Sequence, residues 1–224
     1  MIFPIGDDNI VGGHKPLMAY SLIAINVAIF IFQITLQPAE IESLLTNFGI
    51  IPEEISRGQD VFTLMTSMFL HGGIMHLLGN MLFLWIFADN IEAVVGSTLF
   101  ALFYIVGGLF ASAAHIMTDV SSMIPTVGAS GAISAVMGAY LIMFPKSRIK
   151  VLFIIKTFYI SALVFLGLWF VQQLFSGVGT FAPATAEEAG GVAWWAHIGG
   201  FVYGVAAGWF FKQRFGHRYS YDIV

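Results

Sequence analysis

Long apolar runs separated by short polar segments dominate this chain and set the first expectation about its architecture. A helix needs about 20 mostly apolar residues to cross the hydrocarbon core of a bilayer. Six stretches meet or approach this requirement, and they lie at about 17–36, 71–91, 95–117, 129–144, 149–175 and 195–211. The pattern predicts an all-α integral membrane protein in which residues 1–224 form a single domain with six transmembrane helices.

The composition agrees with this prediction and excludes several kinds of site. The chain has 224 residues and is 58% hydrophobic and 10% charged. Ordinary soluble domains are about half apolar and about a quarter charged. The sequence contains no cysteine, which excludes disulfide bonds, thiolate metal sites and a cysteine nucleophile.

The lysine and arginine residues predict how the chain is oriented in its membrane. With a cytoplasmic N-terminus, the inner segments hold Lys15, Lys146, Arg148, Lys150, Lys212, Arg214 and Arg218. Lys156 lies near the inner end of the fifth predicted helix, and only Arg57 falls outside. Because cytoplasmic loops carry an excess of positive charge, we expect both termini on the cytoplasmic side.

Two outer connections differ from simple turns. Residues 37–62 mix apolar and acidic side chains and are long for a helix connection, so we expect a segment that lies at the membrane interface. Residues 176–194 are rich in glycine, alanine and proline, which favours a mobile loop. Trp194 and Trp195 suit an aromatic belt at the start of the sixth helix.

Strongly polar side chains are rare within the predicted spans, and such groups are functional candidates because burying them in a bilayer is costly. They are His71, His76, Asn80, His115, Ser130, Ser134 and His197. With a rise of about 1.5 Å per residue, four of them lie between about 18 and about 24 Å above the inner boundary. These four are His76, Asn80, Ser130 and His197. They share one layer below the outer edge of the hydrocarbon core.

Small residues give two of these helices a reason to pack closely. Residues spaced by four form one stripe on each helix: Gly200, Gly204 and Gly208 follow His197, and Ser130, Ser134 and Gly138 form the other. Stripes of this kind let membrane helices approach one another. Gly128 and Gly131, beside Ser130, are further packing candidates. Packing the two stripes together would bring His197 to Ser130.

The shared layer has the residue types needed for acyl transfer. A serine becomes a nucleophile when a base such as histidine lies within hydrogen-bond reach. No carboxylate shares the layer, so a Ser130–His197 dyad is favoured over a Ser-His-Asp triad. The free N–H groups at the start of the Ser130 helix, the Asn80 amide and the His76 ring are candidate donors to an oxyanion.

Structural interpretations stand beside these roles. Ser130 alone could be a helix cap, Ser134 a packing residue, and His76 and Asn80 partners in hydrogen bonds between helices. Structural roles are favoured for His71 and His115. A histidine metal site is disfavoured because His71 and His76 are five residues apart and no carboxylate joins them. The common depth of the four residues favours catalysis.

Three motifs occur together and in order: H-x-x-x-N in "HGGIMHLLGNMLFLWIFADNIE", G-x-S-G in "GASGAISAVMGAYLIMFP", and A-H-x-x-G-x-x-x-G in "AHIGGFVYG". Through them nearly the whole chain resembles the rhomboid family of intramembrane serine proteases. The resemblance implies a six-helix rhomboid-like bundle with Ser130 as the nucleophile and His197 as the base. It also implies that His76, Asn80 and the Ser130 backbone N–H stabilise the oxyanion.

The resemblance extends to supporting features and includes two departures. Glu92 matches a glutamate that braces the inner end of the second helix. Residues 37–62 would be a membrane-embedded lateral loop, 176–194 a mobile cap, and the fifth helix a lateral gate for substrate. Residues 37–62 lack the Trp-Arg pair of many members. Ser134 stands where some members stack an aromatic ring on the catalytic histidine.

The sequence therefore predicts an intramembrane serine endopeptidase of the compact prokaryotic form, placed in a bacterial inner membrane with its active site open to the outer side. We expect transmembrane proteins as substrates, cut near helix-weakening residues, and no cofactor, metal or nucleic acid. One alternative is a catalytically silent relative that binds membrane proteins, although such relatives typically lack the serine or the histidine. A channel or transporter would need a polar path that the inner halves of the helices do not supply.

Overall fold

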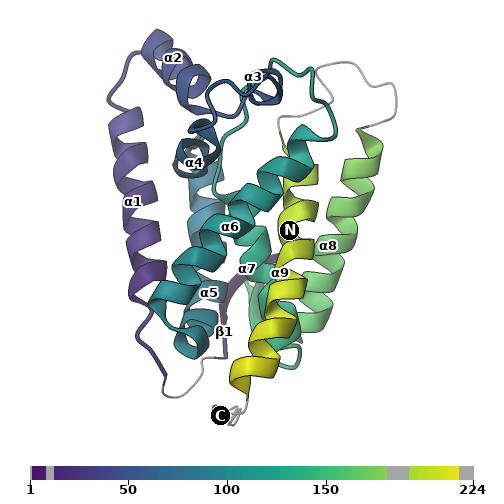
Figure 1. Ribbon diagram of the computed structural model, residues 1–224. Helices are drawn as coiled ribbons and strands as arrows, with labels where there is room; N and C mark the ends of the chain where they lie inside the picture. The colour runs from purple at the N-terminus through teal and green to yellow at the C-terminus, as the bar shows by residue number, and fades with distance from the viewer. Residues whose placement is uncertain (1, 9–12, 181–191, 217–224) are drawn as a thin grey trace.

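The computed structural model describes residues 2–8, 13–180 and 192–216, and within them it shows a bundle of helices with one small sheet (Figure 1). The long helices are α1 (Leu17–Gln33), α5 (Ile74–Val95), α6 (Ser97–Ile116), α7 (Ser130–Met143), α8 (Ala162–Gly179) and α9 (Trp194–Phe215). We call the end that carries α2 and α3 in Figure 1 the upper end, and the opposite end the lower end.

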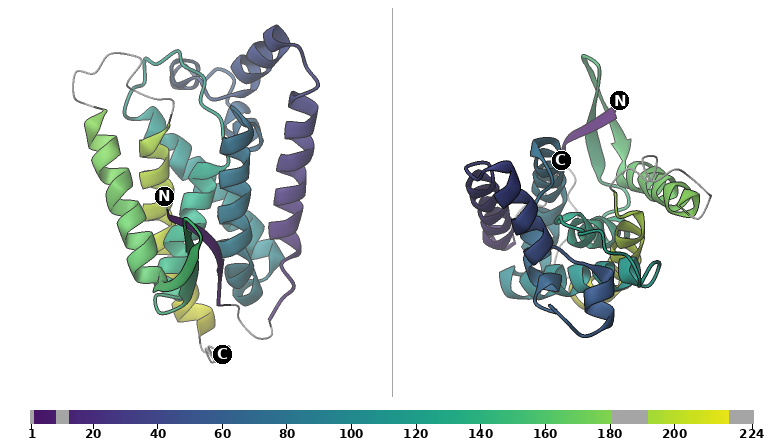
Figure 2. Two further views of the ribbon diagram at one scale, coloured as in Figure 1. Left: turned by 180° about the vertical axis from the view of Figure 1, so that it is seen from behind. Right: turned by 90° about the horizontal axis from the view of Figure 1, so that it is seen from above.

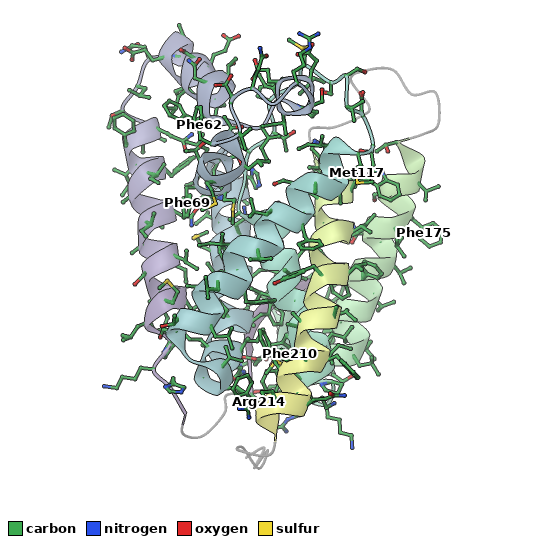
Figure 3. All side chains as sticks on the ribbon, viewed as in Figure 1. Phe62, Phe69, Met117, Phe175, Phe210 and Arg214 are labelled. Carbon is green, nitrogen blue, oxygen red and sulfur yellow. The ribbon has the colours of Figure 1, made fainter. Side chains whose placement is uncertain are left out.

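Five of the six predicted apolar stretches each contain one helix over most of their length: α1, α5, α6, α7 and α9. In the described part of the chain, α5, α6 and α8 are long and apolar enough to cross a membrane, while α1 and α7 are apolar but shorter. Large apolar side chains face outward along the bundle, as Phe175 on α8 and Phe210 on α9 do in Figure 3. This exterior suits a lipid environment.

The stretch 149–175 is not a single helix, and the all-α prediction is wrong over this part of the chain. Strands β2 (Arg148–Phe153) and β3 (Lys156–Ser161) form an antiparallel hairpin, and helix α8 begins only at Ala162. Strand β1 (Ile2–Asp7) pairs with the other edge of β2, which gives the order β1-β2-β3.

The physical reason is a period-2 pattern inside an apolar run. Ile149 and Val151 are fully buried against the bundle, whereas Arg148 is exposed and Lys150 and Leu152 are only partly buried. Such alternation fits a strand with one buried face. Ser161 then caps the start of α8, because its hydroxyl accepts a hydrogen bond from the backbone N–H of Val164 (3.4 Å).

The connection between α1 and α5 is folded into short helices: α2 (Pro38–Phe48), α3 (Pro52–Ser56), α4 (Thr63–Thr66) and the 3-10 helix η1 (Ser67–Phe69). Proline occupies the first turn of α2 and of α3, where its missing N–H costs nothing. Ile50 and Thr126 exchange two backbone hydrogen bonds of 2.9 and 2.8 Å. This bridge ties the connection to the segment that leads into α7.

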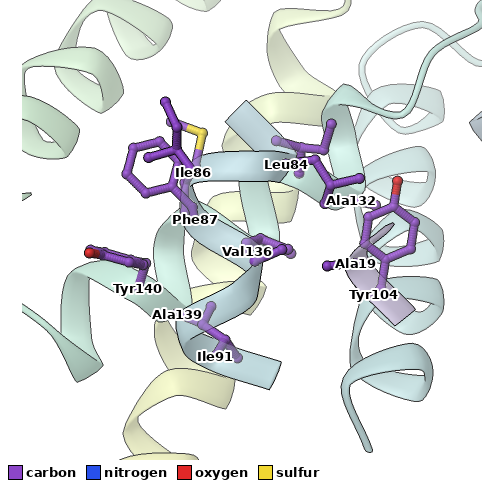
Figure 4. Packing of buried hydrophobic residues seen from close by; sticks show 14 of the residues in the cluster. Ala19, Leu84, Ile86, Phe87, Ile91, Tyr104, Ala132, Val136, Ala139 and Tyr140 are labelled. Carbon is purple, nitrogen blue, oxygen red and sulfur yellow. The ribbon is translucent and has the colours of Figure 1, made fainter. Parts of the chain in front are cut away.

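Helix α7 is the most enclosed helix of the bundle, and most of its residues are buried. On one side its residues, among them Val136 and Tyr140, pack against α5 residues such as Leu84 and Phe87 (Figure 4). On the opposite side it contacts α9 through backbone. A Cβ atom at Gly204 would overlap the carbonyl oxygen of Ala135.

The same close approach recurs along the α7–α9 contact. A Cβ at Gly200 would overlap the carbonyl of Gly131, and one at Gly208 would overlap the backbone of Ala139. On α7, a Cβ at Gly138 would overlap the carbonyl of Phe201. Only glycine fits these positions without moving the helices apart, so the small-residue spacing sets the distance between α7 and α9.

Glu92 lies fully buried near the lower end of α5 and joins three helices. Its two carboxylate oxygens accept hydrogen bonds of 2.8 Å from the backbone N–H groups of Met18 and Ala19, in the first turn of α1. Ser97, at the start of α6, donates its hydroxyl to the same carboxylate (2.5 Å). Glu92 therefore satisfies free N–H groups of α1 from a neighbouring helix.

Candidate active site

Ser130 and His197 meet at the upper part of the α7–α9 contact. Ser130 is the first residue of α7, and its Oγ lies 2.8 Å from Nε2 of His197 on α9. The backbones touch at Gly131, the residue after Ser130, and at Gly200, three residues after His197, so the two side chains reach each other directly. The proximity expected from the small-residue spacing is present in the structure.

Gly128 shapes the approach to Ser130. Its φ of +132° lies in a region that side chains disfavour, and its N–H donates to the carbonyl of Ser67 (2.9 Å). A Cβ at this position would lie 2.7 Å from Cε1 of His76 and 3.7 Å from Oγ of Ser130. His76 therefore lies against the backbone immediately before the nucleophile candidate.

The second ring nitrogen of His197 also has a partner, which the sequence analysis did not identify. His197 Nδ1 lies 2.8 Å from Oε1 of Gln173 on α8, and the Gln173 side chain is 3% exposed. An amide oxygen only accepts hydrogen bonds, so Nδ1 carries the proton. Nε2 is then free to accept from Ser130, which is the tautomer a general base needs. Two adjacent glutamines, Gln172 and Gln173, within a mostly apolar helix were the available signal.

Two tryptophans flank the His197 ring. The Trp169 ring on α8 lies 6.0 Å from it, and the Trp194 ring at the start of α9 lies 6.1 Å away in an edge-on arrangement. Ser134, one turn after Ser130, donates its hydroxyl to the carbonyl of Ser130 (2.7 Å). The aromatic rings beside the imidazole thus come from α8 and α9 rather than from α7.

His76 and Asn80 belong to a polar cluster around the fully buried His71. The His71 and His76 rings are edge-on at 5.1 Å, and the Asn80 amide nitrogen lies 2.9 Å from Nε2 of His71. Gln33 on α1 binds the backbone of His71 twice, donating to its carbonyl (3.0 Å) and accepting from its N–H (3.2 Å). Asn80 is therefore oriented by His71, while His76 faces the backbone at Gly128.

The other polar candidates make local contacts. His115 Nε2 lies 3.0 Å from Oγ1 of Thr126, which joins α6 to the segment before α7. Among the described residues, no group of three or more histidine, aspartate or glutamate side chains is arranged to hold a metal ion. Most of the predicted cap, 181–191, and Arg218 lie outside the residues that the structure describes.

Comparison with known proteins identifies relatives of this chain. The family model described as "Rhomboid domain" matches residues 58–214. Rhomboid protein 1, mitochondrial, of Saccharomyces cerevisiae is 27% identical over 205 residues, which cover 89% of this chain and 55% of that protein. Rhomboid protease GluP of Bacillus subtilis is 31% identical over 194 residues, covering 86% and 34% respectively.

A third relative is the Presenilin-associated rhomboid-like protein, mitochondrial, of Mus musculus, which is 26% identical over 150 residues. The match covers 63% of this chain and 36% of the mouse protein. The chain therefore spans about half or less of the length of these relatives.

Proposed function

This chain belongs to the rhomboid family, and from that membership we propose that it is an intramembrane serine endopeptidase with Ser130 as nucleophile and His197 as base. The observation that carries the proposal is the 2.8 Å contact between Ser130 Oγ and His197 Nε2. Of the three relatives, GluP is the one whose name says protease. Gln173 adds support because its amide oxygen favours the required tautomer of His197.

In the proposed reaction Ser130 Oγ attacks the scissile carbonyl while Nε2 of His197 takes the hydroxyl proton. His197 then gives this proton to the leaving amine, and the acyl-enzyme forms. A water molecule, deprotonated by the same Nε2, hydrolyses the ester and restores Ser130. Nδ1 keeps its proton throughout, bonded to Gln173.

The oxyanion would be stabilised by donors close to Ser130. The backbone N–H groups that open α7 lie at the positive end of the helix dipole. The His76 ring adjoins Gly128, two residues before Ser130. The Asn80 amide has two N–H donors and His71 takes one of them, so the second can turn toward an oxyanion.

The proposed membrane placement follows the charges. We assign α1 and α5–α9 as six spanning helices, with the lower end cytoplasmic and the upper end, where Ser130 lies, outside. Lys146, Arg148 and Lys150 follow the lower end of α7, whereas Arg57 lies at the upper end. Residues 37–62 would form the lateral loop and α8 the lateral gate. The bacterial inner membrane stays a prediction, since the relatives include bacterial and mitochondrial proteins.

The proposed substrates are transmembrane proteins whose scissile bond lies near helix-weakening residues. A peptide bond inside a transmembrane helix is shielded by its own backbone hydrogen bonds, so a local glycine or proline should expose it. Cleavage of a single-span reporter should therefore rise when Gly or Pro is placed near the cut. Equal cleavage of helix-weakened and uninterrupted reporters would contradict this choice of substrate.

A serine-directed fluorophosphonate tests the proposed chemistry. We expect the purified protein to be labelled and Ser130→Ala to lose this label. His197→Ala should be labelled at least about 100-fold more slowly, which is the usual effect of losing a general base. Ser134→Ala is the matched control, because Ser134 lies one turn further along α7, and this variant should keep its label. Wild-type protein that neither labels nor cleaves any reporter would instead support a catalytically silent membrane-protein binder.

A further inference from the structure

The β2–β3 hairpin projects away from the helices. It connects the lower end of α7 to the start of α8, and in the right-hand view of Figure 2 it extends beyond the outline of the bundle. In the left-hand view it lies in the lower half of the molecule, with β1 along its inner edge. The sheet therefore extends sideways from the bundle rather than along its long axis.

The turn of this hairpin lacks the residues that two-residue turns usually contain. Phe153 pairs with Lys156, so the turn consists of Ile154 and Ile155 alone. Two-residue turns favour Asn-Gly or Asp-Gly, because their central residues need positive φ. Here Ile154 adopts a φ of +58°, which is an outlier for a β-branched residue. Ile154 is 73% exposed and Ile155 87% exposed, so packing within the protein does not explain why two large apolar residues occupy this turn.

The two faces of the hairpin differ in polarity. One face is apolar along most of its length and carries Ile149, Val151, Phe153, Phe158 and Ile160, with Lys156 opposite Phe153 at its outer end. Near the bundle Ile149 and Val151 are fully buried, and further out Phe153 is 44% and Phe158 40% exposed. The apolar face thus continues from the protein core to the lipid-facing surface.

The opposite face is mostly polar and carries Arg148, Lys150, Thr157, Tyr159 and Ser161 together with Leu152. The strand pairing sets Lys150 opposite Tyr159 and Arg148 opposite Ser161. The Arg148 guanidinium lies 5.4 Å from the centre of the Tyr159 ring and pairs with Asp8 at 3.0 Å. Residues 146–161 contain four basic side chains and no acidic one, and the four are Lys146, Arg148, Lys150 and Lys156.

We propose that this hairpin is a membrane-surface element that lies in the interface of the leaflet at the lower end of the bundle and binds anionic lipid headgroups. Ile154, Ile155 and Phe158 enter the outer part of the hydrocarbon region. Lys150 and Lys156 stay at headgroup level, where their charge complements anionic lipid. The proposal depends on the membrane placement of the chain and not on its catalytic activity.

The tip position can be measured with one attached probe, because the sequence contains no cysteine. We would introduce Ile155→Cys, attach a nitroxide, and reconstitute the full chain in vesicles of phosphatidylcholine with phosphatidylglycerol. Thr157→Cys is the matched control, since Thr157 is exposed and points to the polar face. At position 155 we expect greater collision with oxygen than with a water-soluble nickel complex, and the reverse order at position 157. Equal access of the nickel complex to both positions would overturn the proposal.

The lipid charge is tested with the same probe. Removing phosphatidylglycerol from the vesicles should raise access of the nickel complex to position 155, and Lys150→Gln with Lys156→Gln should abolish this difference. Arg57→Gln, at the opposite end of the molecule, should leave it unchanged. A probe shielded in native membranes but water-accessible in vesicles would identify a protein as the occupant and contradict the lipid assignment. No dependence on phosphatidylglycerol would also contradict it.

Discussion

Gln173 on α8 holds the imidazole of His197 on α9, with 2.8 Å between Oε1 and Nδ1. The histidine therefore bridges two helices, because its other nitrogen contacts Ser130 on α7. In a Ser-His-Asp triad a buried carboxylate orients the histidine and stabilises its charged form. A neutral amide oxygen can also orient the ring, and it avoids burying a carboxylate among apolar helices.

Removing the Gln173 acceptor should slow catalysis without abolishing it. In Gln173→Leu the imidazole loses one buried hydrogen bond of about 1–3 kcal/mol, so we expect kcat to fall about 10- to 100-fold with KM nearly unchanged. Gln173→Glu keeps an acceptor oxygen at this position and should recover part of the activity. Reporter cleavage kinetics in detergent check both variants. A Gln173→Leu variant with normal kcat would show that the contact does not position His197.

Widening the α7–α9 contact should separate Ser130 from His197. Gly204→Val places side-chain atoms against the Ala135 carbonyl, so we expect loss of fluorophosphonate labelling and an apparent Tm lower by several degrees. Gly167→Ala is the matched control, because a Cβ at Gly167 meets no atom within 4 Å. Membrane insertion of both variants is verified by fractionation. An active Gly204→Val variant would mean that the packing does not set the site.

Glu92 should contribute to stability rather than to chemistry. Glu92→Leu leaves the N–H groups of Met18 and Ala19 without their acceptor, and each unsatisfied buried donor costs about 1–3 kcal/mol. We expect a clear drop in apparent Tm, measured by thermal unfolding in detergent. At a temperature well below this Tm, the folded variant should still be labelled by the fluorophosphonate. Ser97→Ala removes only the third hydrogen bond of the carboxylate and should have a smaller effect. Equal losses in the two variants would contradict this ranking.

Asp7 should make stability depend on pH. The pKa of Asp7 is raised to about 7, chiefly by burial and also by the carboxylates of Asp89 and Asp8, while hydrogen bonds from Tyr140 and Asn90 oppose the rise. Between its ordinary pKa and about 7 the folded protein binds more protons than the unfolded chain, so stability falls as pH rises through this window.

The measurement for Asp7 is apparent Tm between pH 4 and pH 8. The wild-type Tm should decline toward neutral pH, and Asp7→Asn, which cannot ionise, should reduce this slope. Asp60→Asn, in the exposed connection at the upper end, should keep the wild-type slope. A slope unchanged by Asp7→Asn would show that another group controls the pH dependence.

The sequence predicted most helices and the Ser130–His197 contact, because both depend on local patterns. Apolar runs of sufficient length locate the helices, and residues spaced by four mark the face on which Gly200 and Gly204 lie. Counting helix rise from the inner boundary then placed Ser130 and His197 at one depth. These steps need only the period and the rise of a helix.

The hairpin and the role of Gln173 depend on tertiary contacts that local patterns do not reveal. Residues 149–161 are apolar enough to read as helix, and a short apolar run does not distinguish strand from helix by periodicity alone. The Ile154–Ile155 turn carries none of the usual turn residues, and the partner strand β1 lies more than a hundred residues away. Gln173 was not identified because only the structure shows which face of α8 meets His197.

The glycine contacts between α7 and α9 also bear on how the protein tolerates different bilayers. Membrane helices adjust to a thinner or thicker hydrocarbon layer by tilting. Because α7 and α9 touch through backbone atoms at Gly200, Gly204 and Gly208, they must tilt together as one body. The separation of Oγ and Nε2 then stays constant while the angle of the pair to the membrane changes. Differences in membrane thickness would alter how deep the site lies, but not whether its two groups meet.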